Sequence, residues 1–442
     1  MEQNFHDISK IEIIISGGTW HDYPLLYRRN FIYRMYLALN RKKDCSSYNE
    51  IINDISNDER KKKEIKESLL AKIIDEQNLN SKRENRAVGI SIETRPDKIT
   101  YEELVELRRI GVTKVQIGIQ STSDKILELN NRGHGTETSK RAIRLLRLFG
   151  YKIQVHWMCN LLGGNRDNDL EDFQKMFSDK GYLPDELKIY PCSIIKDTKL
   201  YDYYKHGKYK PYDTDDLIKL LADCKQYVPV YTRISRLIRD IPSDNIVAGN
   251  LKSNLRQLVK SYMSERGLKC NCIRCSEVRE SKLDQFSIKD EHLSRKSNPY
   301  HNYAFKIKGF SSNKSINIYH YKTEISDEYF LSYLRDDGRL LGFLRLAIYN
   351  KNNRSDERVL YQAIIRELHV YGVSTKIGSK SKKDVQHRGI GKILLEYAEE
   401  ICKNKGISTL AVISSVGSRK YYEKFGYGLE EDLFYEVKNF SS

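Results

Sequence analysis

The segment Asp384–Glu396 reads "DVQHRGIGKILLE", a glycine-rich loop followed directly by an apolar pattern that predicts a helix. The first N–H groups of a helix have no partner inside the helix, and they lie at the positive end of its dipole. Gly389 and Gly391 would let an anion approach this backbone closely. Arg388 and Lys392 would add positive charge. The loop therefore predicts an anion site, although glycines at a turn are common and the neighbouring elements must decide its ligand.

The elements around this loop predict a sheet of mainly antiparallel strands that begins near residue 301. A helix is expected from the loop to about Lys405, and a second helix carries "SRKYYEKFGY" near the C-terminus. The β-branched and aromatic runs predict four strands, at Tyr329–Leu334, Leu340–Tyr349, Val359–Tyr371 and Thr409–Ser414. Tyr421 and Tyr422 lie on the last helix, where adjacent residues face different ways, so we expect one ring to pack in the core and the other to be functional.

The first half of the chain alternates short apolar strands with helical patterns, which predicts βαβ units and a parallel sheet. The helices Tyr101–Ile110 and Glu137–Phe149 are the clearest. The expected strands are Ile11–Ser16, Val88–Glu93, Lys114–Gln120, Lys152–Met158 and Leu187–Tyr190.

Polar residues gather where these strands end, which is where chemistry occurs in parallel sheets. Glu93, Thr94 and Arg95 end one strand, and Gln120 and Ser121 end the next. Each could instead be a helix cap or a loop ion pair. Their recurrence at equivalent strand ends favours a site at the mouth of a barrel.

The composition indicates a polyanionic partner and excludes a membrane protein. The formal net charge is +16, and "YRRNFIYRMYLALNRKK" (Tyr27–Lys43) interleaves cations with aromatic residues that could stack on unpaired bases. A generally lysine-rich proteome is the alternative explanation. No apolar run is long enough to cross a bilayer, and "MEQNFHDISK" does not resemble a secretory signal. Eight mostly scattered cysteines are typical of a reducing compartment, so we expect a cytoplasmic protein.

Three of the cysteines form a candidate metal site in "KCNCIRC", at Cys270, Cys272 and Cys275. Three thiolates this close suit tetrahedral zinc, which would need one more ligand. The sequence does not select that ligand; the downstream candidates are His292, His301 and His320, and a distant histidine is possible. Free surface thiols are the alternative interpretation.

Several motifs resemble the catalytic subunit family of the Elongator complex. In chain order they are "ISGGTW", "SIETRPDKI", "VQIGIQS", "NRGH", "LKIYPC" and "RDIP". The resemblance runs through nearly the whole chain and implies an α/β fold: a partial radical-SAM (βα) barrel at residues 1–265, a cysteine-rich zinc linker at 266–300 and a GNAT acyltransferase domain at 301–442.

The chain departs from this family in its cysteines. The family holds a [4Fe–4S] cluster through three cysteines after its first barrel strand, whereas this chain begins where the family's second strand begins. Cys45, Cys159, Cys192 and Cys224 are isolated and lack the spacing of a cluster loop. We expect a truncated gene model or a fragment; a separate N-terminal chain and a decayed radical site are the alternatives. Strand Ile11–Ser16 would then be an uncapped edge.

The resemblance also implies site residues. Tyr422 would contact acetyl-CoA with Tyr421 close by, and Arg86 falls where the family uses a lysine to reach the same cofactor. Lys188 would face the barrel mouth. Glu93, Arg95 and Gln120 would line the S-adenosylmethionine (SAM) side. The acetyl-CoA cradle would comprise Glu367, Leu368, His369, Val370, Gln386, Arg388, Gly389, Ile390, Gly391, Lys392 and Ile393.

The resembled activity is the modification of wobble uridines in tRNA. Acetyl-CoA and SAM would together form 5-carboxymethyluridine on the anticodon arm, alone, as a homodimer or with Elongator-type subunits. One alternative is a protein-lysine acetyltransferase, for which Glu367 is the obvious general base. The other is a tRNA-binding protein without catalysis.

Overall fold

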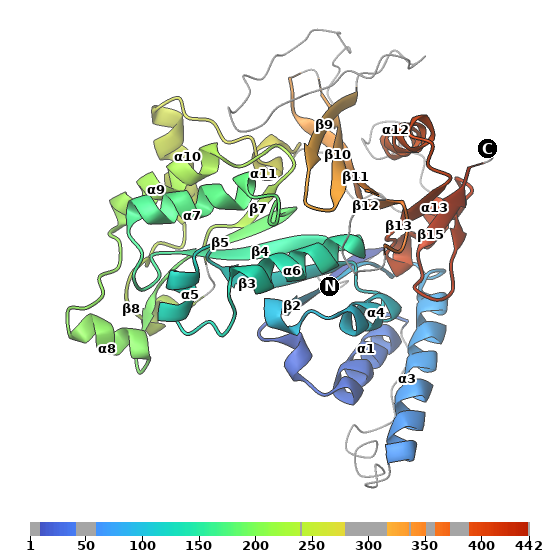
Figure 1. The fold of residues 1–442 in the computed structure, drawn as a ribbon, viewed down its shortest axis with the longest axis horizontal. Helices are drawn as coiled ribbons and strands as arrows, with labels where there is room; N and C mark the ends of the chain where they lie inside the picture. The colour runs from blue at the N-terminus through green and yellow to red at the C-terminus, as the bar shows by residue number, and fades with distance from the viewer. Residues whose placement is uncertain are drawn as a thin grey trace.

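The computed structural model describes residues 9–40, 59–238, 241–278, 316–335, 337–350, 359–371 and 389–440. They form two large sheets that lie against each other, each with its own helices, and a separate two-stranded sheet (Figure 1). The fold is α/β, as expected.

The first sheet has six strands, and every neighbouring pair is parallel. Its strands are, in spatial order, β1 (Lys10–Ile15), β2 (Arg86–Thr94), β3 (Lys114–Gln120), β4 (Lys152–Cys159), β5 (Glu186–Pro191) and β7 (Arg233–Arg236). The five predicted strands are confirmed, but β7, whose sequence "RISR" is short and polar, was not predicted. Among the described residues β1 is the outermost strand, and its residue Ile14 is 55% exposed, as expected for an edge strand.

Helices connect these strands and cover the sheet (Figure 1). They are α1 (Leu25–Leu39), α3 (Glu59–Asn80), α4 (Tyr101–Arg109), α5 (Asp124–Leu129), α6 (Thr136–Leu148), α7 (Arg166–Ser178), α9 (Thr214–Gln226) and α10 (Leu255–Glu265). Several of them pack apolar side chains on the sheet: Leu107 and Leu146, for example, join the same buried cluster as Val115 and Ile117 of β3. This burial supplies the main driving force for the layered arrangement.

Two cations of the segment Tyr27–Lys43 are buried and do not lie on a free basic surface. Arg28 and Arg29 are each 5% exposed, and their guanidinium groups form hydrogen-bonded ion pairs of 2.7 Å with Glu103 and Glu106 of α4. These two arginines fix α1 against α4. The prediction that this segment presents its cations to nucleic acid is therefore wrong for Arg28 and Arg29.

The second sheet has seven strands, of which only β12 and β13 are parallel to each other. In spatial order they are β14 (Gly428–Leu429), β15 (Glu436–Asn439), β13 (Thr409–Val412), β12 (Ala363–Val370), β11 (Leu340–Tyr349), β10 (Ser326–Leu334) and β9 (Ile316–Lys322). Helices α12 (Ile390–Asn404) and α13 (Arg419–Glu423) follow the glycine loop and β13 respectively. The four predicted strands are confirmed, with β12 starting at Ala363 rather than Val359; β9, β14 and β15 were not predicted.

Part of the hydrophobic core is shared between the two halves, while Leu394 and Val412 belong to a separate core on the second sheet. Ala347 of β11 and Ile364 of β12 belong to the same cluster as Leu104 of α4 and Phe149, the C-cap of α6. The approach is so close that a Cβ on Gly150 would lie 2.8 Å from Ile364, and Gly150 also adopts a left-handed φ of 74°. Only glycine satisfies both demands without strain.

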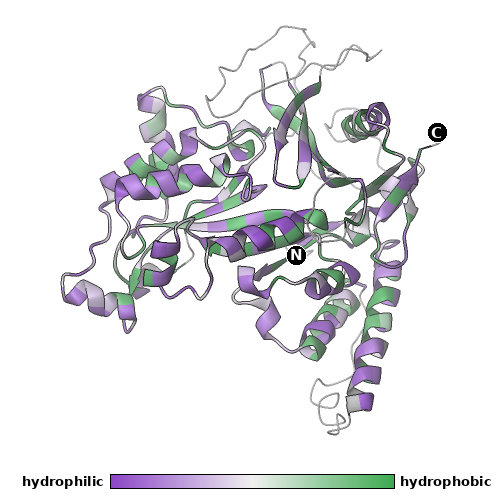
Figure 2. Cartoon of the chain, in the orientation of Figure 1, coloured by the Kyte–Doolittle hydropathy of each residue, from purple (hydrophilic) through white to green (hydrophobic). Residues whose placement is uncertain are grey.

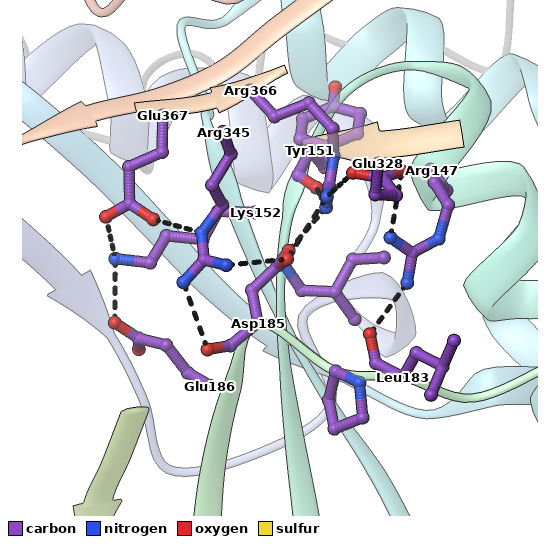
Figure 3. Close-up of polar contacts among 12 residues, drawn as sticks. Arg147, Tyr151, Lys152, Leu183, Asp185, Glu186, Glu328, Arg345, Arg366 and Glu367 are labelled. Carbon is purple, nitrogen blue, oxygen red and sulfur yellow. Dashed lines mark hydrogen bonds and ion pairs between the residues drawn. The ribbon is translucent and has the colours of Figure 1, made fainter. Parts of the chain in front are cut away.

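A buried ion network crosses the same junction (Figure 3). Arg366 of β12 binds Asp185, at the start of β5, and Glu328 of β10. Burial alone would raise the pKa of Asp185, but the charges of Arg366, Arg345 and Arg147 hold it at about 2. Because every charge in this network has an opposite partner, the desolvation penalty is offset and the two sheets are locked in one orientation.

No helix among the described residues is both long and apolar enough to span a membrane. Figure 2 agrees, since the described helices all mix hydrophobic and hydrophilic residues along their length.

Candidate functional site

The strands of the first sheet carry apolar residues on one face and polar residues on the other. Val115, Ile117 and Ile119 of β3 are fully buried against helices, while Gln116 and Gln120 point to the opposite face. The neighbouring strands repeat this alternation, with Gln154 and His156 on β4 and Glu186 and Lys188 on β5. The interior of the partial barrel is therefore a surface of hydrogen-bonding and charged groups.

Four of these interior groups converge near the middle of the sheet. Lys188 donates a hydrogen bond to Oε1 of Gln116, which also lies 3.4 Å from Nε2 of His156. Nδ1 of His156 lies 3.6 Å from a carboxylate oxygen of Glu93. Burial lowers the pKa of Lys188, and the charge of Glu93 opposes that shift. A lysine and a carboxylate in one polar pocket can bind a charged ligand or exchange a proton with it.

The mouth of the barrel holds the other predicted residues. Arg95 pairs with Asp97 at 2.8 Å, and its Nη2 lies 3.0 Å from where a Cβ on Gly133, in the "NRGH" turn, would be. Gln120 adopts a left-handed φ of 66° and folds its amide nitrogen over Gly118. Among the described residues, Oε1 of Gln120 and Nε2 of His134 are buried without a hydrogen-bond partner. Buried polar atoms without partners are costly, so both fit a site that receives a polar ligand.

In the second sheet, strand β12 separates from its neighbour. It pairs with β11 along its whole length, from Ala363 to Val370, but with β13 only at Ala363, Ile364 and Ile365. Beyond that point the edge formed by residues 366–370 faces no strand among those described. The backbone of Glu367, Leu368 and His369, which leads to Val370, can therefore offer hydrogen-bonding groups to an extended ligand.

Helix α12 begins beside this open edge. Its N-cap, Gly389, has a left-handed φ of 74°, no side chain among the described residues caps it, and its first turn carries no acidic residue. Ile390 is buried against the sheet, whereas Lys392 is largely exposed. The N–H of Ile393 already donates to the carbonyl of Gly389 at 3.0 Å, so the helix itself leaves the N–H groups of Ile390, Gly391 and Lys392 for a ligand. They fit an anion such as the pyrophosphate of a nucleotide cofactor.

Tyr421 of α13 lies directly against this turn. A Cβ on Gly391 would lie 2.5 Å from the Tyr421 hydroxyl oxygen and 3.7 Å from Val370. The open strand, the helix N-terminus and one phenol therefore meet at a single place. Burial raises the pKa of Tyr421 to about 12, so the phenol keeps its proton at neutral pH.

Tyr422 is the buried member of the pair, as expected for one of the two tyrosines. It is 6% exposed and its ring packs edge-on against Tyr421 and Tyr427. Burial raises its pKa well above the usual range. Arg86 is brought to the base of the same helix, because Gly417, just before α13, packs directly on the Cβ of Arg86.

Glu367 occupies an ion network rather than a free position. Its carboxylate accepts from Lys152 at 2.6 Å and from Arg345 at 2.8 Å (Figure 3). Burial alone would raise the pKa of Glu367, but these two cations outweigh it and hold the pKa below its usual value. A carboxylate so strongly stabilised in its charged form is a poor general base.

The three cysteines converge as the sequence predicted. The sulfurs of Cys270, Cys272 and Cys275 all lie within 4.8 Å of one another, and this is the one such group among the residues the structure describes. Cys275 also accepts a hydrogen bond from the buried amino group of Lys225, 3.7 Å away. The trio can hold a metal ion.

This cysteine group lies at the opposite end of the barrel from the mouth. The N–H of Ile273 donates to the carbonyl of Thr232, the residue before β7 begins. The trio is therefore at the amino end of that strand, and within the described ranges it does not supply cluster ligands to the carboxyl edge.

Some predicted residues fall outside the described part of the chain. Gln386 and Arg388 of the glycine loop do, as do Cys45 and two candidate fourth ligands, His292 and His301. The third, His320 of β9, is engaged elsewhere, with its Nε2 2.7 Å from Asp327.

Sequence reasoning missed Gln116, His156 and Lys152. The first two were detectable, since "KVQIGIQ" and "KIQVHWM" place polar residues at every second position of otherwise apolar strands. The pairing of Lys152 with Glu367 carried no such signal, because the two residues are 215 positions apart in the chain.

Comparisons with known proteins agree with both halves of this arrangement. Residues 8–177 match the Radical SAM superfamily, residues 184–265 match the Radical_SAM C-terminal domain, and residues 296–427 match the Acetyltransferase (GNAT) family. The half-barrel followed by a GNAT sheet is thus the architecture that the sequence motifs implied.

Similar proteins match this chain across both parts. The tRNA uridine(34) acetyltransferase of Methanocaldococcus infernus is 33% identical over 435 residues, covering 97% of this chain and 72% of its own length. The human Elongator complex protein 3 is 32% identical over 432 residues, covering 97% of this chain and 70% of its own. The solved structure of archaeal Methanocaldococcus infernus Elp3 with an N-terminal deletion superposes with a TM-score of 0.78 at 31% identity, covering 99% of this chain and 92% of that one.

Proposed function

Because the chain belongs to the Elongator catalytic subunit family, we propose that it is an acetyl-CoA-dependent enzyme that modifies the wobble uridine of tRNA. Relatives in that family are named tRNA uridine(34) acetyltransferase and Elongator complex protein 3. The observation that carries the proposal is the meeting of an open strand edge, an uncapped helix N-terminus and Tyr421 in the GNAT sheet.

Acetyl-CoA would bind along these three features. Its pyrophosphate would accept hydrogen bonds from the first turn of α12, and its pantetheine amides would pair with the backbone of residues 367–370. The thioester would then lie near Tyr421 and Tyr422, beyond the end of β12. Lys392 and Arg86 would contribute positive charge from either side.

Tyr421 is the phenol best placed to act on the thioester. When water attacks the acetyl carbon, the C–S bond breaks and the departing thiolate needs a proton. A protonated phenol beside the sulfur can supply it. Tyr422 would act mainly by holding the Tyr421 ring, because its own ring is packed in the core.

The barrel interior would hold the reacting uridine. Glu93 and Lys188 would bind its polar edge, and the buried Gln120 amide and Arg95 would face SAM at the mouth. SAM, when bound with an iron–sulfur cluster, supplies radical chemistry in this family. The product implied by the family resemblance is 5-carboxymethyluridine.

The cysteine trio would bind zinc in a structural role. Three thiolates carry one more negative charge than zinc neutralises, and the amino group of Lys225 lies where it would balance that excess. Metal analysis of the purified chain should give one zinc per chain, and Cys272→Ser should abolish it. Retention of iron in its place would contradict the assignment.

Protein-lysine acetylation is the weaker alternative. It requires a base that removes a proton from the lysine ammonium group, and Glu367 is committed to Lys152 and Arg345.

Thiol release from acetyl-CoA in the presence of tRNA or of a lysine-rich peptide separates the two functions. We expect tRNA to accelerate release and the peptide to have no effect. Tyr421→Phe should lower the accelerated rate about tenfold or more, with a smaller loss for Tyr422→Phe. Acceleration by the peptide alone would overturn the proposal.

A further inference from the structure

A surface helix projects from the carboxyl edge of the barrel. After β5 the chain forms the short strand β6 (Ile194–Ile195) and helix α8 (Lys199–Lys205), and only then enters α9. β6 pairs with β8 (Ile246–Ala248), which follows β7 in the same way. Both insertions are thus βα connections, the segments that surround the active site in barrels of this kind. Figure 1 shows α8 and β8 together at the outer end of the molecule.

The segment after α8 is fixed to the rim of the sheet. Tyr209 donates a hydrogen bond of 2.7 Å to the carbonyl of Asn160, the residue that follows β4. Tyr212 donates one of 2.8 Å to Asp169 of α7, and its N–H donates to the side chain of Asn160. These bonds are largely buried, so α8 is held at the mouth rather than hanging from a loose loop.

Helix α8 contributes no buried side chain to the core. None of its seven residues is buried, yet it carries two large aromatic side chains in solvent, Tyr203 at 42% exposure and Tyr204 at 36%. A helix stabilised only by packing would turn its aromatic residues toward the protein. Exposed, neighbouring aromatic rings instead indicate a surface that contacts something else.

The same surface is strongly basic. Between residues 196 and 210 the exposed acids are Asp197 and Asp202, against five exposed lysines: Lys196, Lys199, Lys205, Lys208 and Lys210. Only one of the lysines pairs with either acid in the structure, Lys205 with Asp202 at 3.2 Å. Aromatic rings between lysines provide the two contacts that a single-stranded polynucleotide needs, stacking for its bases and charge for its phosphates.

We propose that the α8 surface, defined as Tyr203, Tyr204 and the five lysines, binds unpaired nucleotides of the RNA substrate beside the barrel mouth. This inference rests on the proposed function, since it names where the RNA lies. A base held on Tyr203 or Tyr204 would anchor the loop while a neighbouring uridine enters the barrel. Recognition of this kind requires bases that are splayed out of a helix, as in RNA loops.

The test compares two RNA probes with the full chain. One is an anticodon stem-loop that contains the wobble uridine, and the other is a fully paired RNA duplex of matched length. Affinity is measured by fluorescence anisotropy for the wild type and for the double variant Tyr203→Ala/Tyr204→Ala. The matched control is Tyr203→Phe/Tyr204→Phe, which keeps both rings.

We expect the alanine variant to bind the stem-loop at least about fivefold more weakly and the duplex unchanged, because each base lost from an aromatic ring weakens binding by that order. The phenylalanine variant should bind both probes as the wild type does. Lys199→Glu/Lys205→Glu should weaken both probes and reduce the salt dependence, while Lys403→Glu, on the distant helix α12, should change neither.

Two results would overturn the inference. Equal binding of the stem-loop by wild type and alanine variant would show that RNA does not stack here and would leave a protein partner as the occupant. Equal weakening of stem-loop and duplex binding in the alanine variant would show that unpaired bases are not recognised. If the wild type binds no RNA at all, the proposed function fails as well; acetyl-CoA hydrolysis without RNA should stay unchanged in every variant.

Discussion

The junction between the two sheets and the GNAT sheet itself differ in whether their buried charged groups meet partners among the described residues. At the junction, Asp185 is fully buried between Arg366 and Arg345, and its pKa is held at about 2. In the GNAT sheet, the edge of β12 beyond Ile365 faces no described strand, no described side chain caps α12, and Glu436 of β15 is buried with neither carboxylate oxygen hydrogen-bonded among the described residues.

The junction is therefore a rigid contact between the two sheets, whereas the acetyl-CoA region has groups that a ligand can bind. Satisfied buried charges resist movement, because breaking any pair leaves an uncompensated ion. Unsatisfied backbone and carboxyl groups are costly alone and are retained where a ligand completes them. Variants at the junction should therefore lower the free energy of unfolding. Variants in the acetyl-CoA region should weaken the binding of acetyl-CoA, and a variant of Glu436 should change how stability depends on pH.

The largest effect is expected at the junction. Asp185→Asn removes the charge that Arg366 and Arg345 share and should lower the free energy of unfolding by about 3–5 kcal/mol. Urea denaturation followed by circular dichroism measures the loss. Asp223→Asn is the matched control, because its pair with Arg166 is exposed, with 2.8 Å between the charged atoms, and should contribute less than about 1 kcal/mol. Similar losses in both variants would remove the distinction.

A methyl group added at the N-terminus of α12 should weaken acetyl-CoA binding and leave stability unchanged. Gly391→Ala would press on the Tyr421 hydroxyl and should weaken acetyl-CoA about tenfold or more, measured by calorimetry, with the fold intact. Adding Tyr421→Phe should restore much of the affinity, since the ring carbon beneath the hydroxyl is 3.5 Å from the new methyl. Gly428→Ala, where a Cβ meets nothing within 4 Å, is the control. An equal loss in that control would point to general destabilisation.

The smallest effect concerns Glu436 and depends on pH. Burial, reinforced by Glu423, raises its pKa from 4.5 to about 7 despite the opposing charges of Arg419, Lys420 and Arg108. A raised carboxyl pKa means that the folded state prefers the protonated form, so stability is complete below pH 4.5 and is lost as pH rises through 7. Glu436→Gln should therefore stabilise the protein by about 1 kcal/mol at pH 8 and hardly at all at pH 5. Thermal melts at the two pH values check this, and an equal gain at both would refute it.

Local patterns sufficed for most of the fold. Strands β2 to β5 and β10 to β13 carry strong apolar or alternating runs, and the glycine loop marks the start of α12. Strands β7, β14 and β15 have two to four residues and too little pattern to detect, and β9 lies in a polar stretch, "INIYHYK". These short strands form because neighbouring strands already present their hydrogen-bonding edges.

The site was predictable where it uses the backbone and unpredictable where it uses distant charges. The glycine loop with Gly389 and Gly391 is recognisable from a few consecutive residues of the sequence. The ion pair between Glu367 and Lys152 joins residues that are 215 positions apart, so the local sequence indicates an unpaired Glu367 that could act as a base. Arg28 and Arg29 were misjudged for the same reason, since their acidic partners lie on another helix.

The most direct test asks whether the barrel interior controls chemistry in the GNAT sheet. Thiol release from acetyl-CoA should be measured with and without tRNA for the wild type and for Lys188→Ala, a change inside the barrel. We expect tRNA to accelerate release by the wild type, and Lys188→Ala to keep the basal rate but lose the acceleration. Full acceleration in Lys188→Ala, or none in the wild type, would contradict the claim that the two sites serve one reaction.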